Sequence, residues 1–121
     1  MQERRSGTRF VVSFPIRVEW KDENGSKFTE EGLTENVSLE GALIYLPRAL
    51  PSVGSKVNLT VTENADDEVT VKAQVLRLER NPSHPQAALH LTDSIRVWKK
   101  KVWELAAEIN AARKPDAFDD W

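Results

Sequence analysis

The chain has 121 residues, a length expected for one domain, because a single hydrophobic core is usual at this size. Hydrophobic residues make up 40%, charged residues 30%, and the net charge is −2, which argues against a disordered, membrane-spanning or strongly basic chain. The absence of cysteine excludes disulfides, thiolate catalysis and cysteine-ligated zinc, and with no leading signal segment it predicts a cytoplasmic protein without membrane insertion.

The first predicted strand begins at Phe10. Alternate residues are apolar from there on: Phe10, Val12, Phe14, Ile16, Val18 and Trp20. Pro15 has no backbone donor for a sheet ladder, so it is expected at an edge or a bulge. Residues 22–25, with sequence Asp-Glu-Asn-Gly, tolerate positive φ and predict a hairpin turn.

A second strand is predicted from about Lys27 to Val37. Phe28 has the opposite parity to Leu33 and Val37, so a bulge near residues 30–32 is needed if all three face the core.

Four more strands are predicted at residues 42–46, 57–61, 69–78 and 87–91. The alternation slips after Val75, which indicates a bulge before Leu76 and Leu78. Six short strands at this spacing predict an all-β fold, a closed six-stranded antiparallel barrel, with one C-terminal helix.

The period changes near residue 95. Apolar residues then recur three and four apart, at Ile95, Trp98, Val102, Leu105 and Ile109. Residues 92–94 offer N-cap side chains, and the helix is expected to end before Pro115 and to pack on or beside the barrel. The predicted organisation is a flexible arm at 1–9, the barrel and helix at 10–113, and a disordered acidic tail at 114–121.

Two short motifs carry the functional prediction. Arg5 and Arg9 form an RxxxR pattern before the first strand, and Asn36, Ser38 and Gly41 form an NxSxxG pattern between the second and third. Together they resemble the PilZ domain family, which is marked by RxxxR followed by [DN]xSxxG. The resemblance covers nearly the whole chain and implies a barrel that binds the bacterial second messenger cyclic di-GMP.

The chemistry of these side chains agrees with that ligand. Cyclic di-GMP offers phosphates and guanine O6 and N7 acceptors, which a planar guanidinium binds with paired hydrogen bonds. Arg5 and Arg9 lie on an arm that could fold over the ligand. Asn36 could accept a guanine N–H, Ser38 offers its hydroxyl or backbone, and Gly41 allows close approach.

The resemblance also gives Arg4 a role. In this family the position before RxxxR is linked to the number of ligands held, and an arginine there favours a stacked pair. One or two ligands per chain therefore stay open, as does the reading of Arg4 as solvated tail. Arg77 is similarly open between stacking on a base and facing outward as a solvated charge.

The expected function is a receptor that changes its arm and surface on binding and so regulates a partner protein. The alternative is a PilZ-fold protein-interaction domain that does not bind the nucleotide, motivated by the stripe from Trp98 to Ile109 and by Trp103. A homodimer is left open. The downstream process is not indicated by any residue.

Other classes of function are not predicted. A single-strand nucleic-acid binder needs strand-borne aromatics over a basic groove, and neither is evident. No nucleophile and base have a recognisable catalytic spacing, so no enzyme is predicted. His84 and His90 have no cysteine or carboxylate at metal-ligand spacing and are interpreted as surface histidines, so neither metal nor cofactor is expected.

Overall fold

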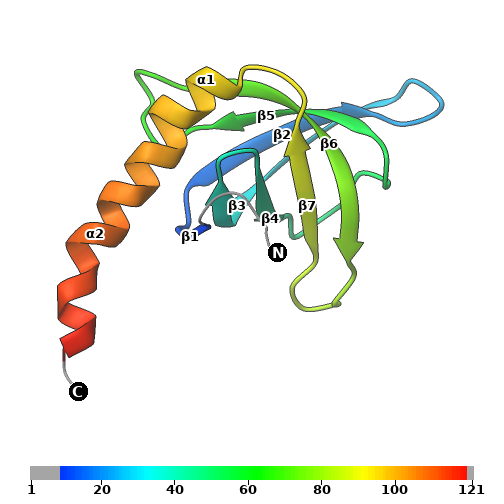
Figure 1. Ribbon diagram of the computed structural model, residues 1–121. Helices are drawn as coiled ribbons and strands as arrows, with labels where there is room; N and C mark the ends of the chain where they lie inside the picture. The colour runs from blue at the N-terminus through cyan, green and yellow to red at the C-terminus, as the bar shows by residue number, and fades with distance from the viewer. Residues whose placement is uncertain (1–8, 120–121) are drawn as a thin grey trace, which may run out of the picture.

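The computed structural model describes the backbone of residues 9–119 and the side chains as far as residue 112. Seven strands precede one helical segment (Figure 1). They are β1 (Phe10–Val11), β2 (Pro15–Lys21), β3 (Lys27–Ser38), β4 (Gly41–Tyr45), β5 (Lys56–Val61), β6 (Val69–Glu79) and β7 (Gln86–Leu91). The helical segment comprises α1 (Ile95–Trp98), the π-helical turn η1 (Lys99–Trp103) and α2 (Glu104–Asp119).

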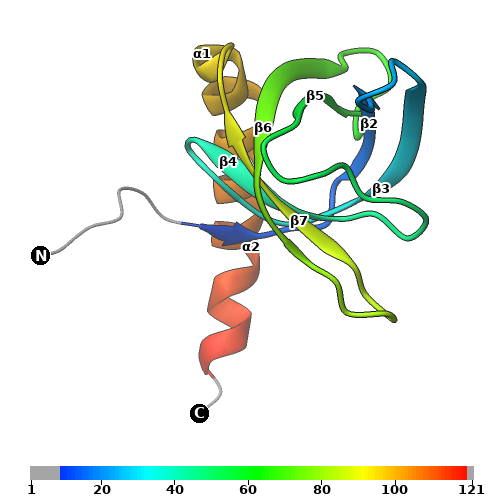
Figure 2. The ribbon, with the colours of Figure 1, turned by 90° about the vertical axis from the view of Figure 1, so that its right-hand side faces the viewer.

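The strands close into an antiparallel barrel (Figure 2). Its six strands follow the order β3, β2, β5, β6, β7, β4, and β4 pairs back with β3. The short β1 pairs with β3 on the same side as β2 and extends that wall. The predicted six-stranded barrel with one C-terminal helix is therefore confirmed, and closure leaves no exposed sheet edge on the ring.

The wall formed by β1 and β2 is interrupted between Val11 and Pro15, whereas one continuous strand was predicted. Thr34, buried on β3, bridges the gap: its Oγ1 accepts the Phe14 N–H at 2.8 Å and donates to the Val12 carbonyl. Its own N–H donates to the Phe14 carbonyl at 2.9 Å. The Thr34 side chain thus takes the place of the backbone ladder just before Pro15.

The bulge in β3 lies at Glu35, not at residues 30–32 as predicted. Pairing between β2 and β3 is regular from Lys27 to Leu33, and the register with β4 shifts between Thr34 and Asn36. The extra residue lets Thr34 and Val37 both face the core, while Leu33 is 40% exposed. The bulge predicted after Val75 is confirmed, since the β6–β7 register shifts there.

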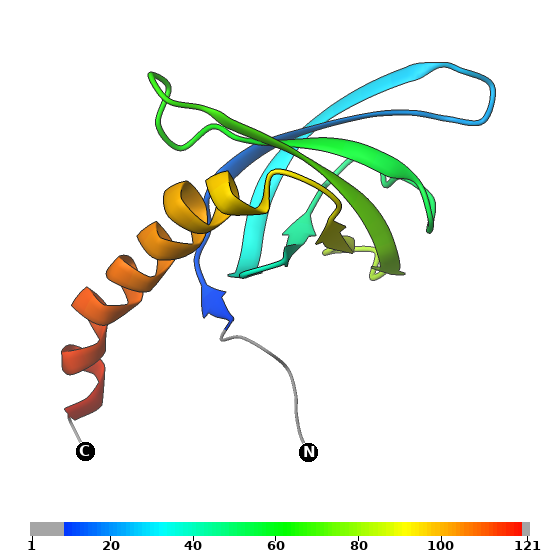
Figure 3. The ribbon, with the colours of Figure 1, turned by 45° about the horizontal axis from the view of Figure 1, so that its top comes forward.

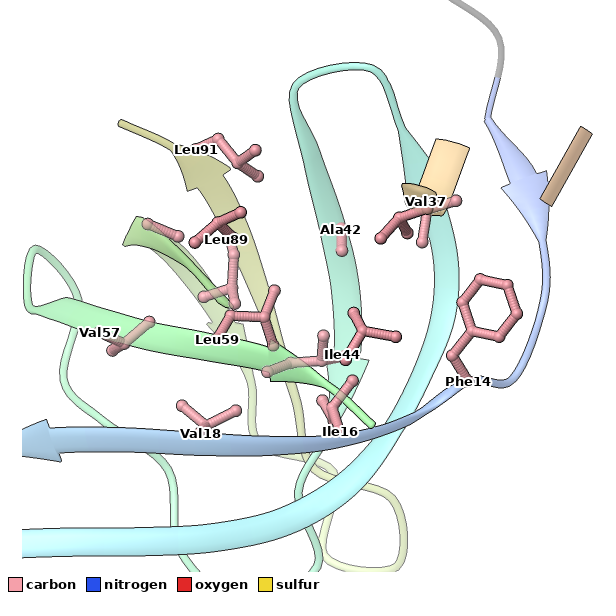
Figure 4. Packing of buried hydrophobic residues seen from close by; sticks show 14 of the residues in the cluster. Phe14, Ile16, Val18, Val37, Ala42, Ile44, Val57, Leu59, Leu89 and Leu91 are labelled. Carbon is pink, nitrogen blue, oxygen red and sulfur yellow. The ribbon is translucent and has the colours of Figure 1, made fainter. Parts of the chain in front are cut away.

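Alternate residues of the strands fill the interior (Figure 4). Ile16, Val18, Ile44, Leu59 and Leu89 are almost completely buried and point toward one another across the barrel. Each such side chain contributes about 1.5 to 3 kcal/mol relative to an exposed one. This core holds the strand ends, where the candidate site residues lie, in fixed positions.

The helical segment covers one side of the barrel near β1 and then extends beyond it (Figures 1 and 3). Of the predicted stripe, Trp98 and Val102 are fully buried and Leu105 and Ile109 are partly buried against the core, whereas Ile95 is 45% exposed. The helix begins where predicted, but Ser94 is left-handed, with φ of 58°, and makes no side-chain cap. In that geometry its hydroxyl does not reach the helix amides.

The helix continues to Asp119 and so passes Pro115, where the sequence predicted its end. Proline removes one backbone donor, and the following residues can still bond to earlier carbonyls. Within residues 9–119, no helix is long and apolar enough to cross a membrane.

We predict that Thr34→Val destabilises the protein by about 2 to 4 kcal/mol, because it leaves the Phe14 N–H and the Val12 carbonyl buried without partners. Thr60→Val is the matched control: its hydroxyl is also buried but bonds only to the exposed Thr70 hydroxyl at 2.8 Å. That change should cost less than about 1 kcal/mol. Urea unfolding measures both, and equal losses would contradict the role given to Thr34.

Candidate ligand-binding groove

A groove of about 440 Å³ opens beside the turn that joins β3 to β4. Side chains from the β1 end, the turn, the β6 bulge and β7 line it. The lining includes Arg9, Asn36, Ser38, Gly41, Leu76, Arg77 and His90. Four of the six residues predicted for the site therefore lie at one groove, while Arg4 and Arg5 lie outside the described residues.

The turn is held on three sides. The Trp98 indole Nε1 donates to the Ser38 carbonyl at 2.8 Å, and the Leu91 N–H donates to the Glu40 carbonyl at 2.8 Å. Gly41 packs so closely on β7 that an added Cβ would lie 2.2 Å from the Leu89 carbonyl oxygen. Gly41 is thus required by strand packing, whether or not a ligand also approaches it.

Arg9 reaches the groove because β1 pairs with the end of β3, where Val11 stands opposite Asn36. The Arg9 Nη1 donates to the Asn36 Oδ1 at 2.8 Å. A guanidinium carries five N–H donors, and this bond uses one of them. Arg9, the last residue of RxxxR, therefore contacts Asn36, the first residue of NxSxxG, although 27 residues separate them.

The helix fixes the point where the N-terminal arm leaves the barrel. Phe10 packs on Trp103 with ring centroids 5.5 Å apart, and the Asn110 Nδ2 donates to the Val11 carbonyl at 3.2 Å. Since Arg9 directly precedes Phe10, its backbone is positioned by both β3 and the helix.

The groove also contains residues that sequence reasoning left open or missed. Arg77 lines it while its side chain is 60% exposed, with Nε 3.4 Å from a Glu79 carboxylate oxygen. Leu76, the bulged residue of β6, is exposed beside it, and His90 pairs with Gly41 across β4 and β7. The slip in parity after Val75 was the signal that β6 presents side chains outward here.

These groups suit an anionic, planar ligand. Arg9 and Arg77 supply guanidinium donors, and Asn36 and Ser38 supply an amide and a hydroxyl. Glu40 is the carboxylate among the described lining residues. The groove is open, so its charges are screened by solvent and salt, and specificity must come from hydrogen-bond geometry rather than from long-range attraction.

His84 lies away from the groove. Its Nε2 is 2.6 Å from the Glu35 carboxylate, and its ring stacks on Tyr45 with centroids 4.3 Å apart. Among the side chains of residues 9–112, no group of three or more histidine or acidic residues could hold a metal ion.

Comparisons with known proteins agree with this architecture. The family model described as "PilZ domain" matches residues 3–99. No curated protein matches the chain by sequence. Twenty-three chains of solved structures are similar to it.

Three of these structures illustrate how similarity and coverage vary. The PilZ domain with c-di-GMP of YcgR from Escherichia coli has a TM-score of 0.67 at 16% identity, over 91% of this chain and 97% of that one. Bacillus subtilis MotI/DgrA, an inhibitor of motility, has 0.70 at 15%, over 93% and 54%. The MrkH–c-di-GMP complex of K. pneumonia has 0.66 at 16%, over 92% and 56%. The chain thus spans nearly all of an isolated domain but about half of the longer proteins.

We predict that Gly41→Ala destabilises the protein by about 2 kcal/mol or more, because its Cβ would meet a backbone oxygen that cannot move alone. Ser38→Ala, in the same turn, removes only a long 3.4 Å contact to the Gly41 carbonyl and should cost less than about 1 kcal/mol. Chemical unfolding compares the two. A fully stable Gly41→Ala variant would contradict the close packing of β4 on β7.

Proposed function

The chain belongs to the PilZ domain family, and from this premise we propose that it is a receptor for cyclic di-GMP, not an enzyme. The single observation that carries the proposal is the convergence of Arg9, Asn36 and Ser38, from both sequence motifs, on one groove. The solved YcgR domain and MrkH complex that resemble this fold contain the same ligand, which supports the choice of nucleotide.

In the proposed binding step, Arg9 exchanges its bond with Asn36 for a phosphate or guanine acceptor. The freed Asn36 carbonyl oxygen then accepts a guanine N–H, and Ser38 donates its hydroxyl to the ligand. This exchange costs little, because the Arg9–Asn36 bond is exposed and a phosphate acceptor, unlike the neutral amide of Asn36, carries a charge opposite to that of the guanidinium.

Arg5 and Arg4 complete the proposed site from the arm. Arg5 closes over the ligand as the partner of Arg9 in RxxxR, and Arg4 favours a stacked pair of ligands, as the family resemblance implies. Closure of the arm changes the surface next to β1 and the helix, and this change is what regulates a partner protein.

The alternative, a protein-interaction domain that ignores the nucleotide, finds less support. It was motivated by the apolar stripe of the helix, but Trp98 and Val102 are fully buried inside the monomer and Trp103 packs on Phe10. These side chains are already used by the barrel and leave little of the stripe for a partner.

We predict that calorimetric titration with cyclic di-GMP detects binding, and that Arg5→Ala and Arg9→Ala each weaken it by about tenfold to several thousandfold, as expected for one or two charge-assisted hydrogen bonds. Arg80→Ala, an exposed arginine outside the groove, should leave the affinity unchanged. The same titration gives one or two ligands per chain. An absence of binding at about 100 μM ligand would refute the proposal.

Arg77 gives a second prediction. Arg77→Ala should weaken binding by about tenfold, the low end for a charge-assisted hydrogen bond in an open groove, without changing stability. Glu79→Gln removes only its 3.4 Å ion pair and serves as the matched control. Identical affinities for wild type and Arg77→Ala would show that Arg77 is a solvated charge outside the ligand's reach.

A further inference from the structure

A second groove, of about 550 Å³, lies at the hairpin end of the barrel. It shares no lining residue with the first groove. Residues of the β2–β3 hairpin, β5 and β6 line it, and this hairpin points away from α2 (Figures 1 and 3). The groove combines four lysines, Lys21, Lys27, Lys56 and Lys72, with the aromatic side chains of Trp20 and Phe28.

The four lysines lie close together despite their like charges. Lys21 stands directly opposite Lys27, and Lys56 and Lys72 line the same groove from β5 and β6. Like charges opposite one another destabilise a sheet. None of the four ammonium groups makes an ion pair or a hydrogen bond with a side chain of residues 9–112. Glu19 is the carboxylate among the described lining residues, so the groove is electropositive.

The aromatic pair forms an apolar surface in this groove. Trp20 and Phe28 are cross-strand partners whose rings stack with centroids 5.4 Å apart and an interplanar angle of 7°. Trp20 is 8% exposed and supports the ring of Phe28, which is 36% exposed. Phe28 is therefore a partly exposed ring, held in place by Trp20, in a groove that the four lysines also line.

Strand-borne aromatics beside a basic groove are the two features that sequence reasoning did not find in this chain. Phe28 was assigned to the core, and the lysines lie far apart in sequence and come together only when β2, β3, β5 and β6 pair. Ammonium groups that track phosphates and a ring that stacks on a base are the elements by which proteins hold nucleotides without reading sequence.

We propose that this second groove binds a phosphate-bearing nucleotide unit, either as a mononucleotide or within a single strand. The lysines contact the phosphates and Phe28 stacks on the base. Glu19 opposes the binding through its negative charge. This site is independent of the first groove and of the ligand proposed there.

The test uses the full chain and a fluorescein-labelled thymidylate oligomer about 12 nucleotides long, followed by fluorescence anisotropy at low salt. Thymidylate contains no guanine, so it does not probe the guanine chemistry of the first groove. We expect binding whose log–log dependence on salt has a slope no steeper than about −3, from four phosphates at about 0.7 each. Thymidine monophosphate is then added as a competitor. Displacement of the oligomer indicates that a free mononucleotide binds the groove, and no displacement indicates that the nucleotide must be part of a single strand.

Variants locate the binding. The double variant Lys21→Gln with Lys27→Gln should weaken binding at least about tenfold, and Phe28→Leu at least about fivefold. Glu19→Gln should strengthen it, and Arg9→Ala should leave it unchanged. Thermal unfolding of each variant checks that the fold is retained, and Phe28→Tyr, which keeps the ring, should bind like wild type.

Two results would overturn the proposal. One is no anisotropy change for the oligomer at low salt. The other is a polyglutamate peptide that binds with the same lysine dependence while Phe28→Leu leaves oligomer binding unchanged, since the groove would then be a docking site for acidic peptides.

Discussion

The candidate site depends on the hydrogen bond from the Trp98 indole to the Ser38 carbonyl, which joins the helical segment to the β3–β4 turn of the barrel. Trp98 is fully buried and Ser38 is half-buried, so breaking this bond would leave the buried indole N–H without its partner. It fixes the helix on the barrel and the β3–β4 turn on the helix. Together with the Leu91–Glu40 bond it holds the groove wall in one conformation before any ligand arrives. A ligand that displaces this turn must move Trp98 or break the bond.

Much of the barrel could be predicted because its pattern is local. The alternation through Ile16 and Val18 and the slip after Val75 both correspond to features of the structure. The interruption before Pro15 could not be predicted in full, because Thr34 lies on another strand and a threonine in a strand does not reveal which distant backbone groups it bonds. The position of the bulge was predicted wrongly because Phe28 and Leu33 were expected to face the core. Both are partly exposed, and the residues that share the inner face are Thr34 and Val37, on either side of Glu35.

The candidate site likewise has a part that the sequence predicted and a part that it did not. Arg9, Asn36, Ser38 and Gly41 belong to short motifs, and the structure brings them to one groove. What the motifs do not contain is the reason for Gly41, which is the carbonyl of Leu89 on β7. The lysine groove has no motif at all, because its members become neighbours only through the sheet register. Sequence reasoning thus finds sites built from contiguous residues and misses those built by strand pairing.

We propose that cyclic di-GMP binds at the turn held by Trp98. The most direct test is a ¹⁵N–¹H NMR titration that follows the indole signals of the four tryptophans and the backbone amides. The account predicts that the Trp98 indole and the amides of residues 36–41 and 88–90 shift together with one affinity, while the Trp20 indole in the second groove stays unchanged. Binding that shifts Trp20 and leaves Trp98 and residues 36–41 unchanged would contradict it.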